Sequence, residues 1–227
     1  MLTHGISASG ATWRHQVPAL EKICSVVTWD LRGHGDSDSP PGPCDLSDLA
    51  ADLRQVADEV GAEKIVALGH SAGGAISLRF ALDYPERTRA LILVGTASEA
   101  NEKSRDFYHS LAGIAEERGM EKVVKRLGMA KEAAHLVPAD PVGFAHVTRA
   151  MAGLNENPMT DRLGEIQCPT LILVGEKDFL GAGGSVIMSR KIADSELEII
   201  PGRGHGLFLE DPEGFNARVA AFLATLD

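Results

Sequence analysis

Residues 69–73 read Gly-His-Ser-Ala-Gly, and this stretch decides the fold of the chain through its place between two predicted elements. It follows the apolar run of residues 65–68, which is typical of a buried strand, and precedes residues 75–82, whose apolar positions recur at helical spacing. A serine on such a strand-to-helix turn exposes its hydroxyl, and the flanking glycines leave room for the sharp backbone. The following helix directs backbone N–H groups toward whatever Ser71 attacks. The pattern predicts a nucleophile elbow.

Two further strand patterns are followed by residues that can assist such a serine. Asp178 comes shortly after the apolar run of residues 170–175, and His205 lies in a glycine-rich loop after residues 198–201. Alone, such an aspartate is a turn former or helix cap, and such a histidine a loop residue. The carboxyl ends of parallel strands meet at one edge of a sheet, however. The chain order Ser71, Asp178, His205 therefore predicts a catalytic triad, in which the histidine takes the serine proton and the aspartate orients the histidine.

Motifs in a fixed order make the chain resemble the α/β-hydrolase superfamily over nearly all of its length. His4-Gly5 resembles the turn after the third strand of that family, and residues 30–37 resemble the loop after its fourth strand. Residues 202–205 resemble the family's histidine loop, and residues 210–212 the approach to its final helix. The resemblance implies a serine hydrolase that needs no metal or cofactor. It also implies an oxyanion hole built from the backbone N–H groups of Ile6 and Ala72.

Strand and helix patterns alternate along the chain and predict a mostly parallel, doubly wound α/β sheet with helices on both faces. Residues 24–29 and 90–95 read as further strands. Between them, a helix is predicted that has Asp45 or Ser47 as its N-cap and ends at Gly61. In the closing helix Asp211 is placed as the N-cap, and the apolar positions are Phe215, Val219, Phe222 and Leu226.

Residues 98–162 break this alternation and contain helical patterns near residues 102–117, 121–127 and 141–154. We therefore predict an all-helical cap at 98–162 inserted into a hydrolase core formed by 1–97 and 163–227. Apolar side chains of the cap are candidates to line a substrate pocket, although most such side chains are plain helix-packing residues: Phe107, Tyr108, Met120, Met129, Phe144 and Met151. Outside the cap, further candidates adjoin the predicted triad in sequence: His70, Phe179 and Leu207.

Composition narrows the class of protein. A chain of 227 residues that is 44% hydrophobic supports one domain with a sizeable core. The formal net charge of −10 argues against a nucleic-acid partner, whose phosphates would repel the protein. No apolar run approaches the length of a membrane span and no secretory signal opens the sequence, so we expect a cytoplasmic protein. The 3 cysteines lack metal-ligand spacing and predict neither a disulfide framework nor a metal site.

The sequence is less specific about the substrate, because one fold hosts many chemistries. Hydrolysis of a carboxylic ester or a lactone is the expected activity. Enol-lactonases and cofactor-free perhydrolases of the same superfamily remain alternatives, because residues 204–207 resemble their histidine loop. Gly206 argues against the C–C bond hydrolases of this fold, which usually carry tryptophan there. From another class, a small-molecule receptor that retains the triad would bind such a ligand without turnover.

The first residues raise a question about the edge of the sheet. Only Met1-Leu2-Thr3 precede His4, whereas members of the family place two strands and most of a third before this turn. The strand at residues 24–29 would then be an exposed edge, and such edges tend to pair with another chain. We expect either that the sequence is a piece of a longer protein or that the chain forms a homo-oligomer through this edge.

Overall fold

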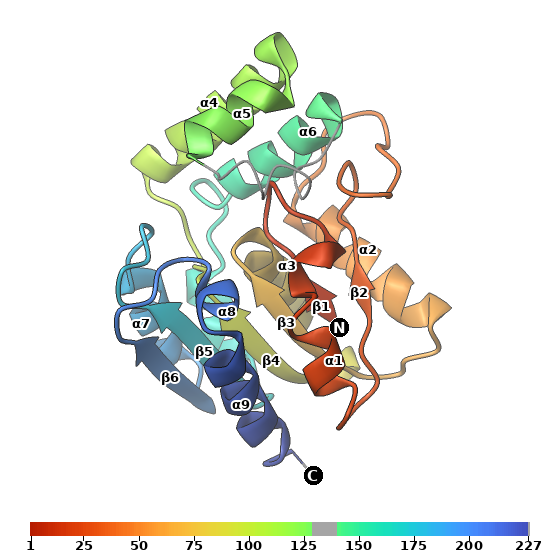
Figure 1. Cartoon of the computed structure of the whole chain (residues 1–227), viewed down its shortest axis with the longest axis vertical. Coiled ribbons are helices and arrows are strands. Elements are labelled where there is room, and N and C mark those ends of the chain that lie inside the picture. Colours follow the sequence, from red (N-terminus) through yellow and green to blue (C-terminus); the bar gives the residue numbers. More distant parts are fainter. Residues whose placement is uncertain (129–139, 227) are drawn as a thin grey trace.

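The computed structural model describes residues 1–128 and 140–226 (Figure 1). Its strands form one parallel sheet in the order β2-β1-β3-β4-β5-β6. The strands are β1 (Leu2–Thr3), β2 (Thr28–Trp29), β3 (Ile65–His70), β4 (Thr88–Val94), β5 (Thr170–Gly175) and β6 (Ser195–Ile200). The α-helices are α1 (Val17–Leu20), α2 (Leu46–Glu59), α3 (Ala72–Asp83), α4 (Glu102–Arg118), α5 (Met120–Leu127), α6 (Pro141–Ala152), α7 (Gly183–Lys191), α8 (Leu207–Glu210) and α9 (Pro212–Leu223). Short 3₁₀ turns are η1 (Gly10–Trp13), η2 (Pro85–Arg87) and η4 (Thr160–Glu165).

Helices cover both faces of the sheet, which confirms the predicted doubly wound architecture (Figure 1). Side chains of α1, α8 and α9 form one buried cluster with the strands, and side chains of α2, α3 and α7 form the cluster on the opposite face. The central strands β4 and β5 are buried along nearly all of their length, as expected of strands sandwiched between two helical layers. Among the described helices, none is long and apolar enough to cross a bilayer.

The caps that the sequence predicts fix the ends of two helices. Asp45 begins α2, where its carboxylate accepts hydrogen bonds from the backbone N–H groups of Ser47 and Asp48. Asp211 begins α9 and accepts from the N–H of Gly214. Such caps satisfy N–H groups that have no partner inside the helix. Of the predicted apolar face of α9, Phe215, Val219 and Phe222 are buried, and Leu226 packs against the same cluster.

The described part of the inserted section contains the α-helices α4, α5 and α6, at the three places where the sequence predicts helices. They lie together beyond the carboxyl end of the sheet (Figure 1). Arg149 of α6 donates to Glu116 of α4, with an Nη1–Oε1 distance of 2.7 Å, and an apolar cluster around Phe144 joins the same helices. The section therefore has a small core of its own. Its limits at 98 and 162 remain a prediction.

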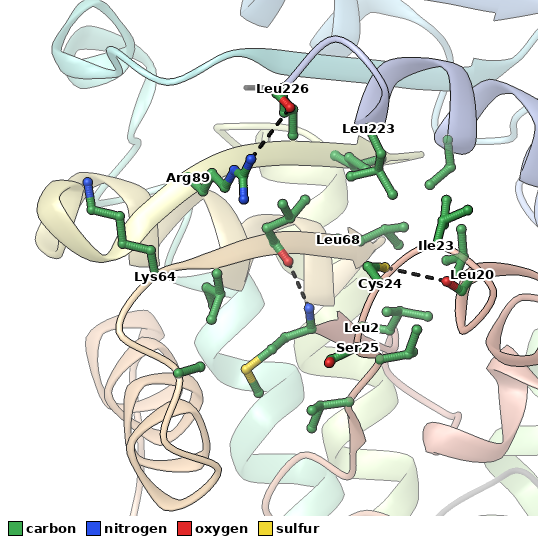
Figure 2. A pocket seen from close by; sticks show the side chains of 18 of the residues that line it. Leu2, Leu20, Ile23, Cys24, Ser25, Lys64, Leu68, Arg89, Leu223 and Leu226 are labelled. Atoms are coloured by element: carbon green, nitrogen blue, oxygen red, sulfur yellow. Dashed lines mark hydrogen bonds between the residues drawn. The ribbon is translucent and has the colours of Figure 1, made fainter.

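The edge of the sheet differs from the prediction. The strand expected at residues 24–29 is reduced to β2, because its neighbour β1 offers only two residues for pairing. An apolar groove of about 780 Å³ lies beside this edge, at the end of the sheet opposite the cap. Figure 2 shows Leu2, Leu68 and Leu223 among the residues that line it. Self-association through this edge stays a prediction.

Two buried histidines lie near the contact between the cap and the core. His4 Nδ1–H donates to Gly5 O at 2.7 Å, and its Nε2 accepts from the N–H of Leu31 at 3.0 Å. His34 Nδ1–H donates to Arg32 O at 3.0 Å, and its ring lies 6.0 Å from that of Phe144 on α6. Burial lowers the pKa of His4 to about 4 and that of His34 to about 3. Both rings are therefore neutral in the folded protein near pH 7.

We expect these histidines to make the protein less stable in mild acid. Below pH 6.5 the unfolded chain binds protons at both rings and the folded chain does not. The free energy of unfolding therefore decreases as the pH is lowered. For His34 alone the loss between about pH 6.5 and 4.5 is roughly 2–3 kcal/mol. Urea unfolding across this range should show a shallower pH dependence for His34→Gln. Exchange of the exposed His109 for Gln is the matched control, and equal slopes in all three proteins would contradict the account.

Candidate active site

Ser71 lies on the sharp turn between β3 and α3, with φ 55° and ψ −118°. A non-glycine residue with positive φ is strained, and close packing on both sides holds it there. A Cβ at Gly69 would collide with Gly73 O, and a Cβ at Gly73 would collide with Thr3 O. The N–H of Ser71 donates to Val94 O of β4 at 2.9 Å. The predicted elbow geometry is therefore present, and small residues are required where the sequence has glycine.

Asp178 and His205 form a hydrogen-bonded pair at the ends of β5 and β6. His205 Nδ1 lies 2.9 Å from Asp178 Oδ2 and 3.0 Å from Oδ1. A carboxylate can only accept, so Nδ1 carries the proton and Nε2 is left with a free lone pair. The Asp178 side chain is fully buried, and the N–H of Leu180 donates to its Oδ1 at 2.9 Å. These contacts fix both the tautomer and the orientation of the imidazole.

Gly95, at the end of β4, brings this pair next to Ser71. A Cβ on Gly95 would lie 3.0 Å from Asp178 Oδ2 and 3.1 Å from His205 Nδ1, and the preceding residue is the one that binds the Ser71 N–H. The three residues predicted from chain order thus gather at the carboxyl edge of the sheet, and among the described residues no hydrogen bond joins the Ser71 hydroxyl to His205. Glu99, an acid that follows β4, accepts instead from Thr160 Oγ1 at 2.6 Å.

Two aromatic rings flank His205. His70 Nε2–H donates to the backbone oxygen of His205 at 3.0 Å, and the two ring centroids are 4.6 Å apart. Burial lowers the pKa of His70 well below its ordinary value, so this ring is neutral. Phe179 stands 4.6 Å from the His205 ring and is 70% exposed. Leu207 is buried in the apolar cluster with α9. His70 and Phe179 therefore contact the histidine, whereas Leu207 supports its loop from the core.

The backbone amides expected to bind an oxyanion adjoin the serine. Ala72 is the residue after it, and a Cβ on Gly5, the neighbour of Ile6, would lie 3.1 Å from the Ser71 Cβ. Within residues 1–128 and 140–226, neither the Ile6 N–H nor the Ala72 N–H donates to another protein group. The oxyanion hole that the resemblance implies needs two such unpaired amides.

A cavity of about 310 Å³ opens at Ser71 between the core and the cap. Of the predicted pocket residues, Met151 and Tyr108 line it. Phe107, Met120 and Phe144 pack in the cap cluster instead, where Phe144 is fully buried. Met129 lies outside the described residues. The sequence analysis missed several lining residues: Thr96, Glu99, Asn101, Ser104, Leu154, Leu180 and Ile187. Their signal is partly in the sequence, because Thr96 directly follows a predicted strand and Glu99 comes three residues later.

Comparisons with known proteins show which family the chain belongs to. The sequence model of the alpha/beta hydrolase fold family matches residues 1–129, and the chain belongs to this family. A protein of Rhizobium rhizogenes named "Putative carbamate hydrolase RutD" is 30% identical over 98% of this chain and 91% of its own length.

Solved structures show the same architecture. A thermophilic esterase from Thermogutta terrifontis matches with a TM-score of 0.90 and 27% identity, over 99% of this chain and 89% of its own. The enol-lactonase from Burkholderia xenovorans has a TM-score of 0.88 over 98% of this chain and 90% of its own. At 22% identity, the lactonase supports the fold alone.

Proposed function

We propose that the protein is a serine hydrolase that cleaves small carboxylic esters or lactones through an acyl-enzyme. The observation that carries this proposal is the Asp178–His205 pair at 2.9 Å, placed beside a strained serine at the wall of a cavity. A serine is a poor nucleophile unless a base removes its proton. His205 Nε2 is the free base in this arrangement.

In the proposed reaction Ser71 Oγ attacks the substrate carbonyl while its proton passes to His205 Nε2. The carbonyl oxygen becomes an oxyanion that accepts from the N–H groups of Ile6 and Ala72. Asp178 stabilises the imidazolium. The tetrahedral intermediate collapses, the alcohol leaves with the proton from His205, and Ser71 keeps the acyl group. A water molecule then attacks the acyl-enzyme by the same steps and releases the acid.

The cavity favours a small substrate. Its volume of about 310 Å³ lies at the lower end of the range for small-molecule sites. Most of the residues that line it are apolar or small, so a short acyl group can bind there without burying a charged side chain. Rates with p-nitrophenyl esters and lactones of increasing acyl length test this proposal. A burst of p-nitrophenol equal to the enzyme concentration supports an acyl-enzyme, whereas ligand binding without turnover would favour a receptor.

Cleavage of a carbamate is a second candidate, because the Rhizobium relative named for that activity covers nearly the whole chain. The same nucleophile and oxyanion hole serve both reactions. The two are separated by comparing p-nitrophenyl acetate with p-nitrophenyl N-methylcarbamate. An ester hydrolase releases its acetyl group rapidly and stays blocked by the carbamoyl group, whereas a carbamate hydrolase turns over the second substrate as well.

Met151 should set the acyl-length preference. Its side chain is 1% exposed and lines the cavity, so Met151→Ala enlarges the space beside Ser71. We expect kcat/KM for a hexanoyl ester relative to an acetyl ester to rise about tenfold, as one or two methylenes in an apolar pocket allow. Met159→Ala is the control, because that methionine is equally buried and lies outside the cavity. The same preference in both variants would remove Met151 from the acyl site.

A further inference from the structure

Among the described residues that line the cavity at Ser71, one is charged, and this is the solvent-exposed Glu99. Its Oε2 accepts from Thr160 Oγ1 at 2.6 Å, and Thr160 Oγ1 lies 2.8 Å from Ser98 Oγ. Because Thr160 donates to the carboxylate, Ser98 must donate to Thr160. The chain of hydroxyl groups holds one carboxylate oxygen in place. In the part of the chain that the structure describes, Oε1 has no hydrogen-bond partner and Glu99 forms no ion pair.

Tyr108 adds an aromatic ring to the same cavity. It lies one helical turn after Ser104, which also lines the cavity, so α4 presents both on one face. Burial raises the pKa of the Tyr108 phenol, and the side chain is neutral. Within the described residues no cation covers this ring, since Arg126 lies over the neighbouring Phe107 at 5.7 Å. An aromatic ring attracts a cation through its electron-rich face.

The start of α4 does not cancel this preference. Helix N-termini favour anions through their free N–H groups, but the Asn101 side chain accepts from the N–H of Ser104 at 2.9 Å and caps the helix. The formal net charge of −10 also raises the concentration of cations near the protein.

From the carboxylate and the ring in one cavity with Ser71, we propose that Glu99 and Tyr108 form a subsite for a substituted ammonium group of the substrate. The proposal rests on the proposed serine hydrolase function and narrows it to esters that carry a cationic amine. Glu99 binds the positive charge, Tyr108 contacts the alkyl substituents through its ring, and the ester carbonyl lies at Ser71. These are specificity-determining residues and take no part in proton transfer.

Two thioesters of nearly equal shape test the subsite. Acetylthiocholine carries a quaternary ammonium, and 3,3-dimethylbutyl thioacetate has carbon in place of that nitrogen. We expect the protein to prefer the cationic substrate about tenfold in kcat/KM at low salt, equal to about 1.4 kcal/mol. Glu99→Gln should bring the ratio close to one, mainly by raising KM for acetylthiocholine. Tyr108→Leu should lower the ratio, and Tyr108→Phe should retain it.

Glu102→Gln is the matched control, because it removes the same charge three residues away, outside the cavity. An equal loss of preference in Glu102→Gln, or an unchanged preference in Glu99→Gln, would overturn the subsite. If neither thioester is hydrolysed, the proposed function fails and the subsite is still tested by binding. In calorimetry the Ser71→Ala protein should bind choline and should not bind 3,3-dimethylbutanol. Adding Glu99→Gln to this variant should abolish the binding of choline. Equal binding of both alcohols would contradict the subsite.

Discussion

Ser71→Ala is expected to lower kcat/KM for p-nitrophenyl acetate by about 10⁴-fold or more. The proposed base and oxyanion donors would remain in place, but no atom would be left to form the acyl bond. Triad residues act as a unit, so loss of the nucleophile removes nearly the whole benefit of the other two. The Ser71 hydroxyl makes no hydrogen bond in the described part of the chain, and its removal should hardly change the melting temperature.

Ser77→Ala is the matched control for this change. Ser77 lies on α3, two turns from the elbow, and is fully buried without a hydrogen-bond partner for its hydroxyl in the described structure. Its exchange should leave the rate within about twofold, as expected of a substitution away from the chemistry. Retention of more than a few per cent of activity in Ser71→Ala would show that another group is the nucleophile.

Asp178→Asn should lower kcat by about 10³–10⁴-fold. Asparagine has almost the same shape, but its amide can donate to Nδ1 of His205 and stabilise the tautomer with the proton on Nε2. That tautomer cannot accept the proton of Ser71. The imidazolium formed during the reaction would also lose the carboxylate that now lies 2.9 Å away.

The control exchanges another aspartate with the same chemistry. Asp161 is exposed, pairs with Lys191 at 3.3 Å and does not line the cavity. Asp161→Asn should leave kcat unchanged. If Asp178→Asn keeps more than about a tenth of kcat, the acid that supports His205 has been misassigned; Glu99 is the next residue to test.

The sequence could predict which residues gather at this edge of the sheet because the rule behind it is local. Each of Ser71, Asp178 and His205 follows a strand, and parallel strands place their carboxyl ends together whatever the rest of the chain does. The helix N-caps at Asp45 and Asp211 were predictable for the same reason. So were the helices α4, α5 and α6 of the inserted section. Their signals lie within a few neighbouring residues.

The cavity walls and the sheet edge depend on contacts between distant segments. Phe144 and Met151 have similar helical patterns, yet Phe144 belongs to the cap cluster and Met151 lines the cavity at Ser71. Only the packing of α6 against both α4 and the core separates them. Residues 24–27 have the composition of a strand, but β1 is too short to pair with all of them. Glu99 follows a predicted strand, and only its contact with Thr160 shows which way the carboxylate is held.

The central claim is that Ser71 is an activated nucleophile, and labelling by a fluorophosphonate tests it most directly. The reagent forms a stable bond with a serine whose proton is removed by a neighbouring base. Mass spectrometry of the digested protein should find one equivalent of label on the peptide that contains Ser71. His205→Ala should react at least about 10³-fold more slowly. No label on that peptide, or labelling that is equally fast without His205, would contradict the account.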